Sequence, residues 1–205
     1  MGMTFSNIHL KKNSKCNEIN LKKYFIEKMD LVGYNEVSEF KEADYIFLIN
    51  TTKESDWISI DSNYFDMESV ENSQELLQTL SSKFKTDCIA VSCINSDFMM
   101  LNWINSEEDF DAWINIEKPY GERYIRKTDF FIWKKKIKKI FAFWYNILKS
   151  HIANAEGAWF TICDLINIDK EKSIFDSRYY IEYPDREENR KLNAIYFKMK
   201  NYGGI

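Results

Sequence analysis

The sequence predicts a single α+β domain over residues 1–205, with an antiparallel or mixed sheet built from β-hairpins and helices packed on one face. Short apolar runs come in pairs separated by polar turns, which is typical of hairpins. Longer segments repeat their apolar residues at helical spacing, and no low-complexity linker divides the chain. Within this domain we distinguish two sub-parts, an acidic helix and hairpin part (1–120) and a helical part with a C-terminal hairpin (121–205).

The first predicted helix covers residues 17–32. Leu21, Phe25 and Met29 recur there at helical spacing, and Gly33 follows as a stop signal. The same spacing predicts further helices at 66–84, 133–148 and 155–168.

Three pairs of apolar or alternating runs predict the strands. They are 45–49 with 57–60, 88–94 with 98–104, and 179–183 with 194–199. Residues 111–119 add an extended segment that ends at Pro119. Asn, Asp and Ser must form most turns, because the chain has only 6 Gly and 2 Pro.

The composition excludes several classes of protein. Aromatic residues make up 16% of the chain, which is typical of a folded protein with a large core. No apolar run reaches the ~18 residues of a membrane span, and the N-terminus lacks the apolar region of a secretory signal, so we expect a cytoplasmic protein. The four cysteines are expected to be thiols, with Cys88 and Cys93 on opposite faces of one strand.

Charge is segregated along the chain, although the formal net charge is only −4. Residues 54–117 contain 14 acids and 2 bases, whereas residues 118–150 contain 10 bases and 2 acids. Stretches of this kind steer partners of opposite sign, or they pack against each other and neutralise. A further hypothesis is a homo-oligomer in which the acidic surface of one copy meets the basic surface of another.

Motifs of common catalytic and cofactor sites are absent from the sequence. It has no P-loop, no dinucleotide-binding glycine motif and no nucleophile elbow. Its two histidines, His9 and His151, have no neighbouring ligands at metal spacing. We therefore expect neither a bound metal nor a cofactor.

Carboxylates and tryptophans are the remaining candidates for a site. Two groups lie near the predicted hairpins, and both are candidate partner-binding residues: Asp97, Trp103, Glu107, Glu108, Asp109, Asp111 and Trp113 in one, and Asp56 and Asp61 in the other. Paired carboxylates can hold Mg²⁺ or catalyse glycoside hydrolysis, so a carboxylate-based hydrolase is one alternative. An acidic surface with aromatic anchors fits a protein ligand better.

A lysine-rich segment suggests a third hypothesis, nucleic-acid binding. Residues Lys134–Lys139 could contact phosphates, with nearby tryptophans for stacking. The lysines and the aromatic residues fall on different sides of the predicted helix, and the acidic balance of the chain opposes nucleic-acid binding.

Three short motifs lie between residues 44 and 113: Trp57-Ile-Ser-Ile-Asp61, Leu80-Ser-Ser82 and Ile94-Asn-Ser-Asp97. In these motifs the chain resembles a poorly characterised bacterial family of small acidic proteins. Asn95 replaces the first acid of the family's acidic turn. Proteins that look like this are frequent among immunity proteins that neutralise bacterial toxins, so the resemblance implies that role. Because residues 54–117 are acidic, we expect a non-enzymatic inhibitor that covers the basic surface of a toxin domain.

Overall fold

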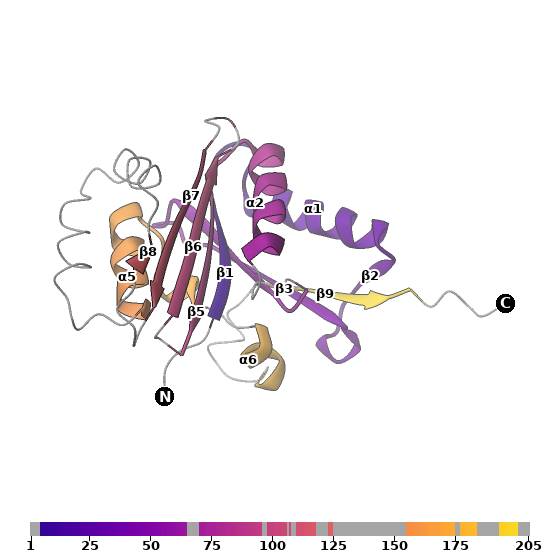
Figure 1. Cartoon of the computed structure of the whole chain (residues 1–205). Coiled ribbons are helices and arrows are strands. Elements are labelled where there is room, and N and C mark those ends of the chain that lie inside the picture. Colours follow the sequence, from indigo (N-terminus) through magenta and orange to yellow (C-terminus); the bar gives the residue numbers. More distant parts are fainter. Residues whose placement is uncertain are drawn as a thin grey trace.

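A computed structural model describes residues 5–64, 70–95, 98–105, 107, 110–117, 123–124, 155–174, 177–183 and 193–200. In these residues nine strands form one antiparallel sheet with the order β2-β9-β3-β4-β1-β5-β6-β7-β8 (Figure 1). The strands are β1 (Phe5–Lys11), β2 (Tyr34–Val37), β3 (Tyr45–Asn50), β4 (Trp57–Ser62), β5 (Cys88–Ile94), β6 (Phe98–Asn105), β7 (Phe110–Glu117), β8 (Arg123–Tyr124) and β9 (Ala194–Met199). The α+β class and the antiparallel sheet predicted from the sequence are confirmed.

Two of the predicted hairpins are present. β3 pairs with β4, with Ile49 opposite Ile60, and β5 pairs with β6, with Val91 opposite Leu101. Between these hairpins lies β1, which the sequence analysis did not assign and which pairs with both β4 and β5. The two hairpins are therefore joined into one sheet by the N-terminal strand.

The prediction of a third hairpin, between residues 179–183 and 194–199, is wrong. Residues 177–182 form the short helix α6 (Ser177–Glu182), although Tyr-Tyr-Ile favours a strand. Tyr180 is buried against β3 residues Ile46 and Leu48, so tertiary packing overrides the local preference. β9 instead inserts between β2 and β3, which places a strand from the second sub-part inside the sheet of the first.

Three of the four predicted helices are found, as α1 (Glu18–Leu31), α2 (Val70–Phe84) and α5 (Ala155–Ile166). Asn17 caps α1, because its side chain accepts a hydrogen bond from the backbone N–H of Asn20. Two short 3₁₀ helices, η1 (Phe40–Glu42) and η2 (Glu171–Ser173), complete the described elements. The helix predicted at 133–148 lies outside the described residues.

Helices cover both faces of the sheet, whereas the sequence predicted them on one. The core on one face includes Phe25 of α1, Leu80 of α2 and Ile8 of β1. The core on the other face includes Trp159 of α5 and Phe5 of β1. Figure 1 shows α5 on one side of the sheet, and α1 and α2 on the other. Central strands such as β5 are apolar in both directions for this reason.

All four cysteines are buried thiols. Cys88 and Cys93 belong to the cores of opposite faces, as the strand alternation predicts. Burial raises the pKa of Cys16 to about 12, so this thiol is protonated at neutral pH. In the part of the chain that the structure describes, no helix has the length and hydropathy needed to cross a membrane.

Candidate functional site

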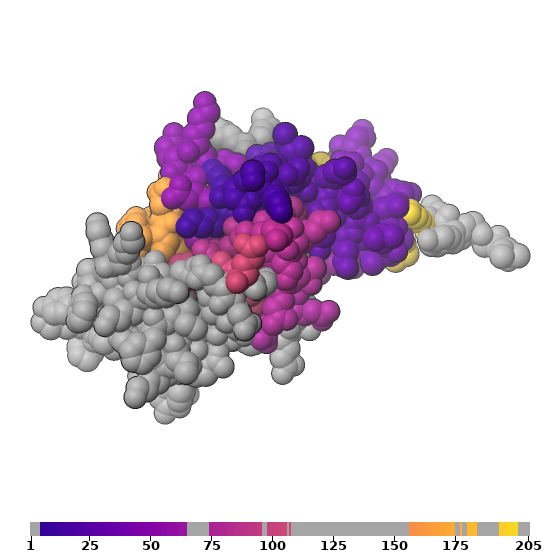
Figure 2. Space-filling model, turned by 90° about the horizontal axis from the view of Figure 1, so that it is seen from above, coloured from indigo at the N-terminus to yellow at the C-terminus, as the bar shows by residue number. Residues whose placement is uncertain are grey.

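The sheet topology gathers four connecting loops at one end of the strands. Lys11 at the end of β1 lies opposite Trp57 at the start of β4, and Cys88 at the start of β5 lies opposite Ile104 near the end of β6. The loops at this end comprise residues 12–17, 51–56 and 85–87 together with Glu107, and we call them the loop platform. Figure 2 looks down on this end of the molecule, where the N-terminal residues in indigo lie against later segments in purple and pink.

Hydrogen bonds between loops brace the platform. The side-chain amide of Asn13 donates to the carbonyl oxygens of Phe84 and Lys85 at 3.2 and 3.1 Å. The same side chain accepts from the backbone N–H groups of Lys15 and Cys16, both at 2.7 Å. Asn13 therefore fixes its own turn and attaches it to the loop after α2.

Lys12 joins the first loop to the second. Its Nζ donates to the carbonyl oxygens of Thr52 and Ser55 at 2.6 and 2.5 Å, and its backbone N–H donates to the carbonyl of Asp56. Burial lowers the pKa of Lys12, and the nearby carboxylates of Asp56 and Glu54 oppose that shift. This lysine therefore serves the structure of the platform.

The end of α5 holds the second loop from its other side. Asn167 has φ 62°, a left-handed conformation that asparagine tolerates better than most residues. Its side-chain amide donates to the carbonyl of Glu54 at 2.9 Å, and its own carbonyl accepts from the hydroxyl of Ser55 at 3.1 Å. The indole N–H of Trp57 donates to the carbonyl of Ile166 at 2.8 Å. Loop 51–56 is thus held between Lys12 and the end of α5.

Glu107 adds a carboxylate from the fourth loop. Its backbone N–H donates to the side chain of Asn105, which in turn donates to the buried carboxylate of Asp87 at 2.6 Å. Its side chain is about half exposed and forms an ion pair with Lys85 at 3.2 Å. The backbone is therefore fixed while the carboxylate faces solvent.

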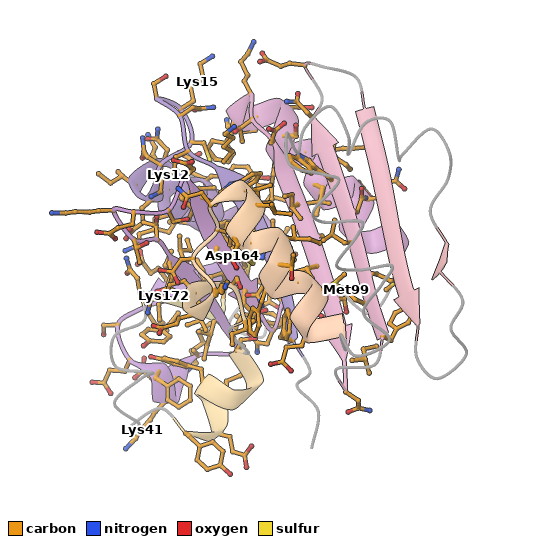
Figure 3. All side chains as sticks on the ribbon, turned by 90° about the vertical axis from the view of Figure 1, so that its left-hand side faces the viewer. Lys12, Lys15, Lys41, Met99, Asp164 and Lys172 are labelled. Carbon is orange, nitrogen blue, oxygen red and sulfur yellow. The ribbon has the colours of Figure 1, made fainter. Side chains whose placement is uncertain are left out.

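The charges that the platform presents are mixed. Glu54, Asp56 and Glu107 are exposed, and so are Lys15, Lys53 and Lys85. Figure 3 shows Lys15 and Lys12 at this end, far from Lys41 at the opposite end of the molecule. In the described residues, the acidic side chains of this end are interleaved with lysines and do not form a uniformly acidic face.

The structure separates carboxylates that the sequence places close together. Glu107 lies at the platform, whereas Ile94 and Phe98, which flank the predicted site residue Asp97, pair at the opposite end of the sheet. The seven residue steps of β6 between these ends span about 23 Å. Asp97, Glu108 and Asp109 themselves lie outside the described residues, as do His151 and the lysine-rich segment 134–139.

Two predicted site residues belong to the interior. Trp103 is 3% exposed, and its ring packs against Trp57 with centroids 6.0 Å apart, so it is not a surface anchor. Asp61 is 6% exposed and accepts a hydrogen bond from the backbone N–H of Ser177 at the start of α6. Asp111 and Trp113 are in β7, opposite Ile104 and Asn102, and their side chains lie outside the described ones.

A buried histidine and serine also form a pair. Nδ1 of His9 lies 2.9 Å from the hydroxyl oxygen of Ser59 on the neighbouring strand, and the His9 ring packs against Trp159 of α5 with centroids 5.0 Å apart. Burial lowers the pKa of His9 to about 3, so the imidazole is neutral at neutral pH. Because the two side chains are 0% and 2% exposed, no substrate reaches this pair.

No group of three or more His, Cys, Asp or Glu side chains in the described ranges could hold a metal ion. No protein-family model matches the chain, and no significant match exists among curated proteins or solved structures. The case for function therefore rests on the geometry of the platform.

The bracing residues of the platform, Lys12, Asn13, Asn105 and Asn167, were not identified from the sequence. Their bonds join loops up to 113 residues apart, as between Asn167 and Glu54. The one local signal is the polar run Lys12-Asn13-Ser14 at the start of the 12–17 turn, which indicates a turn but not its contacts.

Proposed function

We propose that this protein is a non-enzymatic protein-binding module that contacts its partner with the loop platform. Its most concrete form is an immunity-type inhibitor, located in the bacterial cytoplasm, that covers the basic surface of a toxin domain. Glu54, Asp56 and Glu107 would pair with lysines and arginines of that partner.

The observation that carries the proposal is the bracing of exposed charged loops on a rigid sheet. Binding residues are commonly found on loops that a scaffold positions. Asn13, Lys12 and Asn167 already fix the backbone of the platform, so little conformational entropy remains to be lost when a partner binds.

The mixed charges favour a partner with a matching pattern. Opposite charges across an interface accelerate association, and like charges exclude wrong partners. Lys53 and Lys85 among the carboxylates would therefore select a surface that carries some acidic residues beside its basic ones.

Affinity capture at two salt concentrations tests the proposal. The tagged full chain is incubated with an extract and the secreted proteins of its native cells, and bound proteins are eluted with about 50 mM and then about 500 mM salt before mass spectrometry. We expect one basic protein that stays bound at low salt and elutes at high salt. Recovery of nucleic acid alone, or of no protein above an unrelated acidic bait, would contradict the proposal.

A further inference from the structure

The strand β2 forms one edge of the sheet, and its backbone is open on one side. In the described residues it pairs with β9 alone, with Tyr34 opposite Met199 and Glu36 opposite Phe197. The backbone N–H of Lys200 donates to the carbonyl of Gly33 at 2.8 Å, so Gly33 and Lys200 are a hydrogen-bonded pair.

This bond fixes the direction of every backbone group in β2. In an antiparallel pair, hydrogen-bonded and non-hydrogen-bonded positions alternate. Gly33, Asn35 and Val37 therefore bond to β9, whereas the N–H and C=O groups of Tyr34 and Glu36 point away from the sheet. The open edge offers two donors and two acceptors at alternate residues.

Exposed apolar side chains lie beside this edge. Leu31 is 83% exposed and Val32 is 46% exposed, and Gly33 alone separates them from β2. Met199, which lies opposite Tyr34 on β9, is 58% exposed. Clustered exposed apolar residues of this kind are typical of protein interfaces.

We propose that β2 pairs with the β2 strand of a second copy of this chain, antiparallel and about a two-fold axis at Asn35. Tyr34 of each copy then exchanges both backbone hydrogen bonds with Glu36 of the other, which uses all four outward groups. Leu31, Val32 and Met199 flank the seam, and the two nine-stranded sheets become continuous.

The side chains of β2 suit this register. Each Glu36 faces a Tyr34 of the other copy, so no like charges lie directly opposite each other. Asn35 faces itself across the axis, and it is exposed in the single chain. A second copy fits better than an unrelated extended peptide because the strand complements its own sequence.

The mass in solution is the first test. Light scattering after size exclusion should give twice the 24.6 kDa of one chain. Glu36→Pro removes one outward N–H from each copy and no bond to β9, so it should raise the dimer dissociation constant roughly tenfold or more.

A matched pair of apolar variants controls for the possibility that Glu36→Pro disturbs the fold. Leu31→Gln should also weaken the dimer, whereas Ile19→Gln should not, because Ile19 is 78% exposed at the other end of the same helix. A single-chain mass for the wild type at all concentrations would overturn the proposal. A dimer that Glu36→Pro and Leu31→Gln both leave intact would overturn it too.

Disulfide formation tests the register. With the axis at Asn35, the two Asn35 Cα atoms lie about 4.5 Å apart, within the range of a disulfide. Asn35→Cys should therefore form a covalent dimer when dioxygen with a copper catalyst accepts two protons and two electrons from the two thiols. Glu36→Cys places its Cα atoms roughly 8 Å apart and should cross-link much less. Equal cross-linking of both variants would contradict this register, and the four buried native thiols do not compete.

Discussion

The loop platform and the buried polar residues of β1 and β4 are built on the same two strands, but their side chains face different surroundings. Asp56 precedes β4 and is exposed, whereas Asp61, five residues later, is buried against the start of α6. Lys12 follows β1 at the platform, whereas His9, three residues earlier, is enclosed by Ser59 and Trp159. The comparison teaches that polar residues close in sequence are exposed or buried according to where the strand ends.

The largest expected effect concerns the buried region. Trp159→Ala removes a fully buried indole that packs on His9 and donates to the hydroxyl of Ser173 at 3.0 Å. We expect a loss of about 3–5 kcal/mol in the free energy of unfolding, measured with urea. The exposed control Ile19→Ala should change it by less than about 0.5 kcal/mol. A small effect of Trp159→Ala would mean that α5 contributes little to the core.

The second prediction is the pH dependence that His9 confers. Its pKa is about 3 in the folded protein and 6.5 in the unfolded chain, so the unfolded chain binds more protons between these values. The contribution of neutral His9 to the free energy of unfolding is therefore lost as the pH falls below 6.5. The loss is about 2 kcal/mol between pH 7.5 and pH 5.0. His9→Gln should reduce this dependence by that amount in urea unfolding at the two pH values. If His9→Gln leaves the pH dependence of the free energy of unfolding unchanged, His9 has an ordinary pKa in the folded protein.

Loss of the hydrogen bonds that brace the platform should have a smaller effect on the free energy of unfolding. Asn13→Ala removes four hydrogen bonds at an exposed turn and should cost about 1 kcal/mol of stability. Amide hydrogen exchange of Lys15 and Cys16 should accelerate at the same time. Gln78→Ala, at an exposed position of α2, serves as the control. Unaltered exchange in Asn13→Ala would contradict the braced platform.

The exposed ion pair of the platform should matter least for stability. Glu107→Gln breaks the contact with Lys85, in which both side chains are about half exposed. The free energy of unfolding should change by less than about 0.5 kcal/mol, because solvent screens such pairs. A loss above about 1 kcal/mol would assign Glu107 to the structure rather than to binding.

The sequence predicts the local parts of this fold. Apolar runs gave the hairpins β3–β4 and β5–β6, and helical spacing gave α1, α2 and α5. β1 was missed because it has no apolar run, and because Asn7 and His9 are polar yet buried, which interrupts the pattern of one of its two buried faces. β9 was assigned to the wrong partner, because its pairing with β2 and β3 joins segments that are distant in sequence.

The candidate site was predicted less well, for a related reason. Proximity in sequence grouped Glu107 with Asp97 and Trp103, but a strand carries adjacent loops to opposite ends of the sheet and turns alternate side chains inward. Asp56 and Glu107 lie at the same end of the sheet because β1 joins the two hairpins.

The most direct test of the platform compares two triple variants in affinity capture at low salt. Glu54→Gln, Asp56→Asn and Glu107→Gln remove three charges from the platform, whereas Glu27→Gln, Glu39→Gln and Glu42→Gln remove three exposed charges elsewhere. We predict that the wild type and the second variant retain the same basic protein, and that the first variant loses it while its melting temperature stays the same. Equal retention by both variants would contradict the assignment of binding to the platform.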